Sequence, residues 1–242
     1  MRYLAIVQYD GTSYQGWQIQ PDAISLQEEI EKVLSRILNT PTKIYASGRT
    51  DAGVHALGQT FHFDSKEITD LDRFKYALNS LLPKDIHILS LSNITCDMHA
   101  RYNVKEKTYI YLINMGEYDV FNRDHIYQLN RELDLSKIKE ASKLFIGEHN
   151  FMNFTSKDED EDNFVRNIYS IDISKENNTL IITFKGDGFM KYMVRMIVGA
   201  FIEVGLSRLD ISKLKEIFEL RPRKVCSFKA PTNGLYLKEV RY

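Results

Sequence analysis

Hydrophobic side chains recur at the start of the chain first at the spacing of a strand and then at the spacing of a helix. Apolar residues on both faces of residues 2–9 are typical of a strand that is buried on both sides. Ser25-Leu26-Gln27-Glu28 then has the form of a capping box, in which the first and last side chains satisfy backbone amides at the start of a helix. Apolar residues follow three and four positions apart, so residues 25–39 are predicted to form an amphipathic helix whose stripe lies in the core.

The same two spacings predict the other elements of the chain. Strands are expected at residues 43–46, 59–63, 86–92, 107–114, 165–173, 179–185 and 235–241. Helices are expected from a capping pattern at Thr69 and Asp72 to Pro83, from Leu135 to near Gly147, over residues 188–202, and around Leu214, Ile217 and Phe218. The order strand, long loop, helix, strand occurs twice, which predicts two related α+β halves, residues 1–103 and 104–242, that meet near residue 104.

Charge and cysteine content narrow the class of protein. The 242 residues include 32 Lys and Arg and 33 Asp and Glu, for a formal net charge of -1. No global attraction to a polyanion or a membrane follows, so any phosphate would have to meet a local basic patch. Cys96 and Cys226 form no CxxC pair, which favours neither a zinc site nor a disulfide framework and suits a reducing compartment. The pattern shows neither a signal peptide nor a membrane span, and we expect a cytoplasmic protein.

The densest group of polar residues forms a loop, Ser47-Gly48-Arg49-Thr50-Asp51-Ala52-Gly53-Val54-His55-Ala56-Leu57-Gly58-Gln59. Its glycines permit a close approach of other atoms to the backbone. Arg49 stands two residues from Asp51, so a bidentate donor and an acceptor lie within one tight turn, and this pairing would keep the carboxylate ionised. Two interpretations fit these residues equally: a catalytic carboxylate, or a loop that a salt bridge holds to the rest of the fold.

A strand and a helix carry the other candidate functional groups. Tyr109 and Tyr111 share one face of the strand predicted at 107–114, where a phenol can stack on a ring or move a proton.

Arg195 lies inside the apolar helix predicted at 188–202, on one stripe with Lys191 and Gly199. Burial without a partner would cost this guanidinium on the order of several kcal/mol, so a carboxylate or a phosphate is expected to meet it. A purely structural ion pair explains the same pattern.

A metal site built from Asp51, His55, His62 and His99 is the weakest of the interpretations. No two of these residues have the helical spacing of an HExxH motif, and a glycine-rich loop would hold ligands loosely. The chain has no GxSxG setting for a nucleophile and no GxxxxGK[ST] or GxGxxG phosphate loop after a strand. No second carboxylate stands at motif spacing to Asp51, which disfavours a two-carboxylate glycosidase.

Two charged segments bear on a polyanionic ligand. Residues 158–162 form an acidic run, typical of a solvated, mobile loop that would repel phosphates. Arg221-Pro222-Arg223-Lys224 is a compact basic cluster and the best candidate in this sequence for a patch that contacts phosphate. A solvated turn explains the basic cluster nearly as well.

Six groups of residues, spread over nearly the whole chain, carry a resemblance to a known family. They are Tyr9-Asp10-Gly11 with Tyr14, Gly16-Trp17-Gln18 and Gln20; Gly48-Arg49-Thr50-Asp51-Ala52-Gly53-Val54-His55-Ala56; His99-Ala100-Arg101; Lys107-Thr108-Tyr109-Ile110-Tyr111; Gly188-Phe189 with Met193-Val194-Arg195 and Ile197-Val198-Gly199; and Ala230-Pro231 with Gly234-Leu235-Tyr236-Leu237. Together they resemble, in order, the motifs of the bacterial tRNA pseudouridine synthase A family. The chain departs from the family in having Met98 where members often have Phe, and in its acidic run and neutral overall charge.

The resemblance implies a fold and an activity. The implied fold is α+β, a mixed and mainly antiparallel central sheet built from two similar halves, with helices on one face and a cleft between the halves. The implied activity is the isomerisation of uridine to pseudouridine at positions 38, 39 and 40 in the anticodon arm of tRNA. Members of the family use no metal or cofactor and are typically homodimers that bind tRNA across both subunits.

The resemblance also implies catalytic roles for three residues. Asp51 matches the catalytic aspartate that breaks the bond between ribose and base, by attack on the sugar, attack on the ring, or a glycal route. Tyr109 matches the tyrosine that stacks on the target base and removes the proton from its carbon 5. Arg195 matches the basic residue that pairs with the aspartate.

Further residues match positions that bind substrate or support the loop. Arg49 matches the arginine associated with turning the target nucleotide out of the stack, a step that costs a few kcal/mol of unstacking. Leu235 matches an apolar wall of the pocket, and Arg101 and Trp17 lie within matched motifs and are candidates for substrate binding. His55 is then expected to brace the loop rather than to bind a ligand.

Two other functions compete with this interpretation. A noncatalytic tRNA-binding or chaperone protein of the same fold would bind tRNA without changing it, but such a protein has no use for the three catalytic matches. An enzyme acting on a small carbohydrate or nucleotide would show no salt-dependent binding of tRNA.

Overall fold

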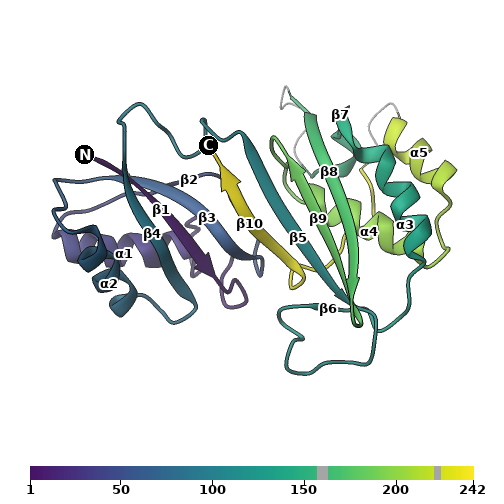
Figure 1. Cartoon of the computed structure of the whole chain (residues 1–242), viewed down its shortest axis with the longest axis horizontal. Coiled ribbons are helices and arrows are strands. Elements are labelled where there is room, and N and C mark those ends of the chain that lie inside the picture. The colour runs from purple at the N-terminus through teal and green to yellow at the C-terminus, as the bar shows by residue number, and fades with distance from the viewer. Residues whose placement is uncertain (157–162, 221–224) are drawn as a thin grey trace. The chain divides into compact units, whose positions relative to one another are not determined.

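A computed structural model describes residues 1–156, 163–220 and 225–242 of the chain (Figure 1). These residues divide into two compact units, one made of Met1–Lys105 with Tyr236–Tyr242 and the other of Glu106–Leu235. The last strand is thus grouped with the first unit, whereas the sequence assigned it to the half that begins at residue 104. Each unit combines strands and helices, which confirms the α+β class.

The sheet of the first unit has the strand order β4-β1-β3-β10. Its elements are β1 (Arg2–Tyr9), β3 (His55–Asp64), β4 (Ile86–Ile94), the part of β10 (Leu235–Arg241) that belongs to this unit, and β2 (Tyr45–Ala46), which pairs with β3. β1 runs antiparallel to both β3 and β4, and β10 runs parallel to β3. The predicted strands are therefore present, and β3 begins four residues before the expected start at Gln59.

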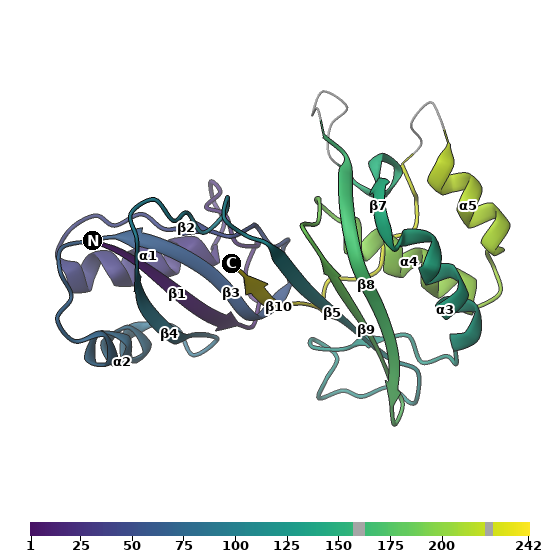
Figure 2. The ribbon, with the colours of Figure 1, turned by 45° about the horizontal axis from the view of Figure 1, so that its top comes forward.

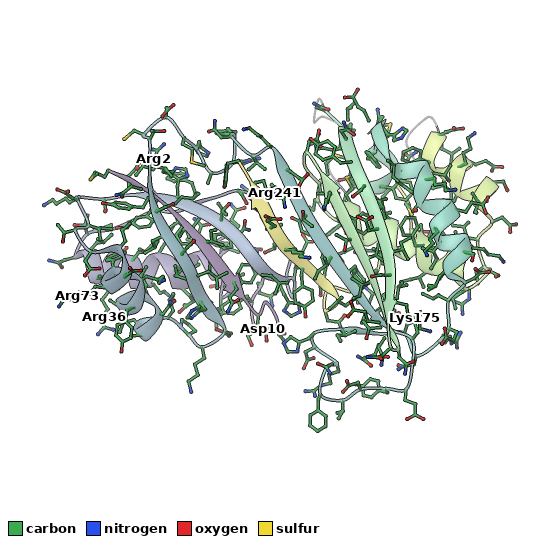
Figure 3. The ribbon with its side chains drawn as sticks, in the orientation of Figure 1. Arg2, Asp10, Arg36, Arg73, Lys175 and Arg241 are labelled. Carbon is green, nitrogen blue, oxygen red and sulfur yellow. The ribbon has the colours of Figure 1, made fainter. Side chains whose placement is uncertain are left out.

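Alternation along β1 decides which of its side chains enter the core. The odd-numbered residues Tyr3 to Tyr9 are buried, but Leu4 and Ile6 on the opposite face are only half-buried. The expectation of a strand buried on both faces is correct for one face only. At the start of the strand stands Arg2, which is labelled in Figure 3. It makes a bidentate ion pair with Asp64 on β3, with N–O distances of 2.8 and 2.9 Å.

Helix α1 (Leu26–Leu38) follows its capping signal closely. The Ser25 hydroxyl accepts a hydrogen bond from the Glu28 amide, as the capping box predicts. The second helix, α2 (Leu71–Leu81), is capped by Asp70 rather than by Thr69, because the Asp70 carboxylate accepts from the Arg73 amide. The two helices pack against each other, and α2 packs beside β4.

The sheet of the second unit has the order β5-β9-β8-β7, with every neighbouring pair antiparallel. Its strands are β5 (Glu106–Asn114), β7 (Gly147–Asn150), β8 (Val165–Glu176) and β9 (Thr179–Gly186), and the short β6 (Tyr127–Gln128) pairs with β5. β8 and β9 correspond to the strands predicted at 165–173 and 179–185, and they form a hairpin around a two-residue turn at Asn177 and Asn178. Asn177 has a φ of 52°, a left-handed conformation that asparagine tolerates well.

Three α-helices lie together beside this sheet in both views of the ribbon (Figure 2). They are α3 (Leu135–Ser142), α4 (Met193–Gly205) and α5 (Ile211–Glu219), and two 3-10 turns, Lys143–Phe145 and Met152–Phe154, continue the chain around them. The expected helix over residues 188–202 is wrong at its start, because Tyr192 has a φ of 64° and α4 begins only at Met193. Lys191 therefore lies before the helix rather than on its surface stripe.

Aromatic rings fill the core between these helices. The Phe145 ring lies between 5.1 and 6.5 Å, centroid to centroid, from the rings of Phe151, Phe154, Phe201 and Phe218. Nearby, the buried Asn153 side chain donates to the carbonyls at the end of α5, with a shortest distance of 2.9 Å to Ile217. This bond satisfies carbonyls that a helix end leaves without an internal partner.

Two expectations fall on residues outside the described part of the chain. These are the acidic run at 158–162 and the basic cluster at 221–224. Among the described helices, none has both the length and the apolar character needed to cross a membrane.

Candidate active site

The loop that carries Asp51 is fastened to the strand that follows it. We call residues 47–54 the Asp51 loop. The buried Gln59 side chain accepts from the Ser47 hydroxyl at 2.6 Å and donates to the Gly48 carbonyl at 3.0 Å. The Ser47 amide also donates to the Thr60 carbonyl at 2.9 Å. Because one amide side chain bonds two successive residues, the entry of the loop has little freedom to move.

The middle of the Asp51 loop is fastened at Thr50. The buried Thr50 hydroxyl is 2.8 Å from the Tyr9 hydroxyl, and the Thr50 carbonyl accepts from the Trp17 amide at 3.1 Å. A Cβ on Gly16, whose φ is 94°, would lie 2.7 Å from that same carbonyl. Only glycine fits at position 16, since the loop that contains it touches the Asp51 loop backbone to backbone.

The exit of the Asp51 loop is fastened through His55 to the loop between β1 and α1, residues 10–25, which we call the first loop. The buried imidazole accepts a hydrogen bond from the Gly11 amide on Nδ1 at 3.1 Å, and its ring stacks on Tyr236 at 4.7 Å. Gly53 donates its amide to the Tyr14 carbonyl at 3.2 Å. These contacts agree with the expected bracing role of His55.

The Asp51 loop has two charged side chains, and neither of them is fully buried. Asp51 is half-buried and Arg49 is exposed, whereas Thr50 between them is buried. The backbone on both sides of the half-buried Asp51 carboxylate is thus held by hydrogen bonds to other elements.

Trp17 lies in the core of the first unit. Its side chain is only 2% exposed, and its ring packs 5.9 Å from Tyr9 and 6.2 Å from Phe61. In this structure it supports the loop that borders Thr50.

His62 and His99, two of the candidate metal ligands in the sequence, use their Nδ1 atoms as acceptors for backbone amides. His62 accepts from Ala100, and His99 accepts from Arg101, each at 3.1 Å. The two rings meet edge to face at 4.5 Å. Burial and, to a smaller extent, the positive charge of Arg2 lower the pKa of His62 to about 4. Arg101 itself is exposed, with its guanidinium 5.9 Å from the Tyr102 ring.

The two tyrosines of β5 have different surroundings. Tyr111 is fully buried and donates its hydroxyl to the Pro231 carbonyl at 2.8 Å, and burial raises the pKa of its phenol well above the usual value. Tyr109 is half-buried, with its ring edge to face with Phe189 at 5.2 Å. Of the pair, Tyr109 is the one that a ligand can reach.

Arg195 is held by the segment that precedes β10. Its Nε donates to the Ala230 carbonyl at 2.8 Å, and its backbone carbonyl accepts from the Ala230 amide at 2.9 Å. Its guanidinium lies 5.2 Å from the centre of the Tyr192 ring. A Cβ on Gly199 would lie 2.7 Å from the Lys229 nitrogen, so the glycine lets this segment reach α4.

The sequence singled out both Arg195 and Ala230-Pro231, but it gave no sign that they are in contact. The motif Ala230-Pro231 supplies acceptors to two site residues, since Arg195 and Tyr111 bond its successive carbonyls. Leu235, which follows this segment, is 5% exposed. No spacing in the sequence connects residue 195 to residue 230, because their contact is made across the fold.

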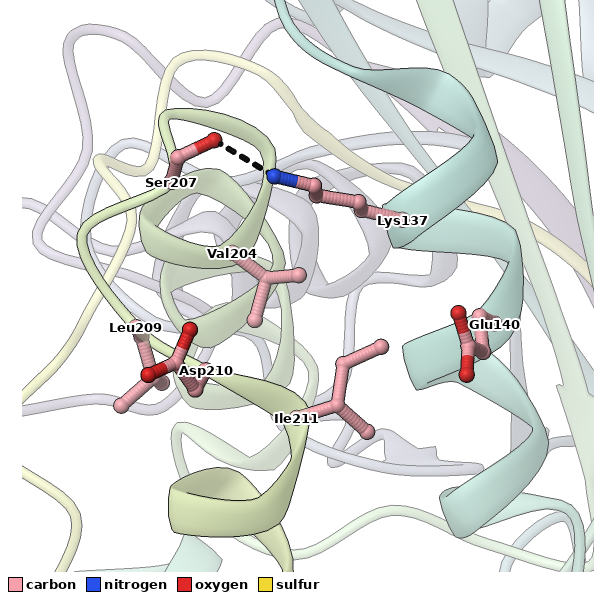
Figure 4. A pocket seen from close by; sticks show the side chains of 7 residues that line it. All are labelled: Lys137, Glu140, Val204, Ser207, Leu209, Asp210 and Ile211. Atoms are coloured by element: carbon pink, nitrogen blue, oxygen red, sulfur yellow. Dashed lines mark hydrogen bonds between the residues drawn. The ribbon is translucent and has the colours of Figure 1, made fainter.

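A small hollow in the second unit lies away from these residues. It has a volume of about 180 Å³ and is lined by Lys137, Glu140, Val204, Ser207, Leu209, Asp210 and Ile211 (Figure 4). Lys137 donates to the Ser207 hydroxyl at 2.9 Å across it. None of the predicted site residues lines it.

A model of the family described as tRNA pseudouridine synthase matches residues 5–103 and 141–242 of the chain. The chain belongs to the tRNA pseudouridine synthase family. Members of this family are isomerases that convert uridine to pseudouridine, and the chain is one of them. The matched ranges include Asp51 and Arg195 but not residues 104–140, which hold Tyr109.

Relatives within the family are similar over the whole chain. The tRNA pseudouridine synthase A of Listeria monocytogenes serotype 4a (strain HCC23) is 42% identical over 245 residues, covering 100% of this chain and 99% of the relative. The enzymes of the same name from Mycoplasma genitalium and Streptococcus mutans are each 39% identical, again over 100% of this chain and 98% and 99% of the relatives. The strand with Tyr109 thus lies within a region of similarity to proteins of this name.

Proposed function

We propose that the chain converts uridine to pseudouridine at positions 38, 39 and 40 in the anticodon stem-loop of tRNA, with Asp51 as the catalytic carboxylate. The observation that carries the proposal is the similarity to relatives named tRNA pseudouridine synthase A over the full length of both chains. The rigid attachment of the Asp51 loop supports it, because catalysis needs a reactive group whose position is set in advance.

The reaction requires one bond to break and one to form. The bond from ribose C1′ to N1 of uracil breaks, the base turns, and C1′ bonds to C5. The proton on C5 leaves, and N1 carries a proton in the product, so the product is an isomer of the substrate. Neither an oxidant nor a reductant is consumed, and the proposal includes no metal or cofactor.

In this proposal Asp51 acts in breaking the bond between ribose and base. The half-buried phenol of Tyr109 stacks on the base and takes the C5 proton, a role for which the fully buried Tyr111 is unsuited. Arg195 sets the charge and geometry of Asp51 as the basic residue of the site.

The remaining assignments concern binding. The exposed guanidiniums of Arg49 and Arg101 contact the RNA, and Leu235 forms an apolar wall of the pocket. Trp17 acts through the first loop, since only 2% of its surface is exposed. We further propose that the chain works as a homodimer in the cytoplasm.

The substitution Asp51→Asn tests the catalytic assignment. It keeps the shape of the side chain and removes its negative charge, so we expect pseudouridine formation to fall about a thousandfold or more with tRNA binding retained. Carbodiimide-dependent primer-extension stops in the anticodon arm measure the product, and filter binding measures the affinity. Asp72→Asn on the exposed start of α2 is the matched control and should retain full activity.

Three outcomes of this experiment separate the candidate functions. Normal stops with Asp51→Asn would contradict the catalytic role of the carboxylate. Salt-dependent tRNA binding by the unaltered protein without any product would favour a noncatalytic tRNA-binding or chaperone protein. Absence of both binding and product would favour an enzyme that acts on a small molecule.

A further inference from the structure

Three cationic side chains gather around one aromatic ring in the second unit. The Tyr192 ring centre lies 4.6 Å from Nζ of Lys229, 5.2 Å from Nζ of Lys191 and 5.2 Å from the guanidinium carbon of Arg195. We call these four residues the Tyr192 cluster. Cations near a ring face gain from its quadrupole, on the order of 0.5–1 kcal/mol each at exposed sites.

The Tyr192 cluster concentrates positive charge on a chain whose formal net charge is -1. Its cations lie within about 10 Å of one another, since each is about 5 Å from the same ring centre. That separation is close to the Debye length of ~8 Å at physiological ionic strength, so salt only partly screens their repulsion. An anion bound among them would relieve the repulsion.

The two lysines of the cluster have no carboxylate partner among the described residues. Other lysines, by contrast, do form ion pairs, among them Lys32, Lys43, Lys75, Lys175, Lys213 and Lys215. Lys191 and Lys229 are both exposed, and neither has its charge offset by a neighbouring acid in this part of the chain. Within residues 1–156, 163–220 and 225–242, no acid thus competes with a ligand for their ammonium groups.

The backbone on which the cluster stands is held from several sides. The Lys191 carbonyl accepts from the Thr155 hydroxyl at 3.0 Å. Lys229 precedes Ala230, whose amide and carbonyl both bond to Arg195, and its nitrogen lies where a Cβ on Gly199 would clash. The fold thus fixes the backbone positions from which both lysine side chains extend toward the Tyr192 ring.

We infer that Lys191 and Lys229 form, with the Tyr192 ring, a subsite beside Arg195 for a backbone phosphate of the RNA. Ammonium groups bind phosphate as point charges from any direction, which suits the sugar-phosphate backbone rather than a base edge. The inference rests on the proposed function, because it takes tRNA as the ligand.

The salt dependence of tRNA binding tests the subsite. Each lost phosphate contact reduces the magnitude of the slope of log affinity against log salt by about 0.7 for a single strand and about 0.9 for a B-form duplex. We expect Lys191→Gln and Lys229→Gln each to reduce the magnitude by about this amount, and the double variant to reduce it by about twice as much. Lys191→Arg should restore the slope. Asp51→Asn as background allows binding to be measured without turnover.

Steady-state kinetics provide a second measurement. A contact made equally in the ground and transition states changes KM and leaves kcat unchanged. We therefore expect Lys191→Gln and Lys229→Gln to raise KM for tRNA several-fold at nearly constant kcat, with unchanged thermal unfolding. Lys139→Gln, an exposed lysine on α3, is the matched control and should alter neither slope nor KM.

Two results would overturn the inference, and they are distinguishable from each other. The subsite would be ruled out, and the proposed function left intact, if the slope for Lys139→Gln were matched by the slopes for Lys191→Gln, Lys229→Gln and the double variant. Failure of the unaltered protein to bind tRNA at any salt concentration would overturn both.

Discussion

His62 shows at the scale of a single residue how the fold removes a charge. The side chain is buried, and its Nδ1 accepts from the Ala100 amide, which only the imidazole without a proton on that atom can do. Burial, reinforced by the nearby charge of Arg2, lowers its pKa to about 4. As a neutral hydrogen-bond acceptor, His62 thus holds the loop that carries Arg101.

The lowered pKa predicts how stability depends on pH. In the unfolded chain a histidine has a pKa of about 6.5, so between pH 6.5 and about 4 the unfolded state binds the extra proton and the folded state does not. The contribution of His62 is complete above pH 6.5 and is lost as the pH falls toward 4, by at most about 1.4 kcal/mol per pH unit.

Urea unfolding of the protein and of His62→Gln at pH 7.5, 6, 5 and 4.5 measures this contribution. Glutamine keeps an acceptor for the Ala100 amide but does not titrate. The His62→Gln variant should therefore lose less stability on acidification than the unaltered protein. Parallel pH profiles for the two proteins would show that His62 is not the titrating group.

At the scale of elements, α4 packs closely against the segment before β10. The contact depends on Gly199, where an added Cβ would lie 2.7 Å from the Lys229 nitrogen and 2.9 Å from the Phe228 carbonyl carbon. Both are backbone atoms, which cannot turn away as the end of a side chain can.

Gly199→Ala is expected to destabilise the protein by about 1–3 kcal/mol. This cost exceeds the gain of up to about 1 kcal/mol that alanine brings to a helix interior. Thermal unfolding measures the stability, and a fall in pseudouridine formation is expected because the segment also sets the position of Arg195. Gly205→Ala in the same helix is the control, since the nearest atoms there are the side-chain ends of Ile138 and Leu133. Equal losses in both variants would contradict the backbone contact as the cause.

At the scale of the whole molecule, the chain completes its first unit with its last residues. Tyr236 and Leu237 pair with His55 and Ala56 on β3, directly after the Asp51 loop. The Tyr242 hydroxyl donates to the Ala100 carbonyl at 2.9 Å. Residues from the two ends of the sequence therefore share one sheet.

Removal of residues 236–242 should destabilise the first unit selectively. It exposes β3 and removes the ring that stacks on His55. Hydrogen exchange followed by mass spectrometry is the measurement, with lost protection expected in peptides from β3 and retained protection in peptides from α3 and β9. Deletion of Tyr242 alone is the milder control. Uniform loss of protection in both units would show that they do not unfold separately.

The strands and helices of this protein were predictable because their signals are local. Ser25 and Glu28 determine where α1 begins, and the alternation over 107–114 identified β5. Predictions failed where a distant or conformational feature decides the outcome. The start of α4 depends on the positive φ of Tyr192, which no local apolar pattern reveals.

The residues of the candidate site were predicted from their chemistry and from resemblance to family motifs, because a carboxylate among glycines and an arginine in an apolar helix stand out in the sequence. Tertiary structure decided which groups hold them: Gln59 bonds Ser47 and Gly48, and Ala230 bonds Arg195. It also decided that Tyr109, not Tyr111, is accessible, and that Lys191 and Lys229 share one ring. The physical reason is range: periodicity and capping act within a few residues, whereas burial and charge depend on which distant segments the folded chain brings into contact.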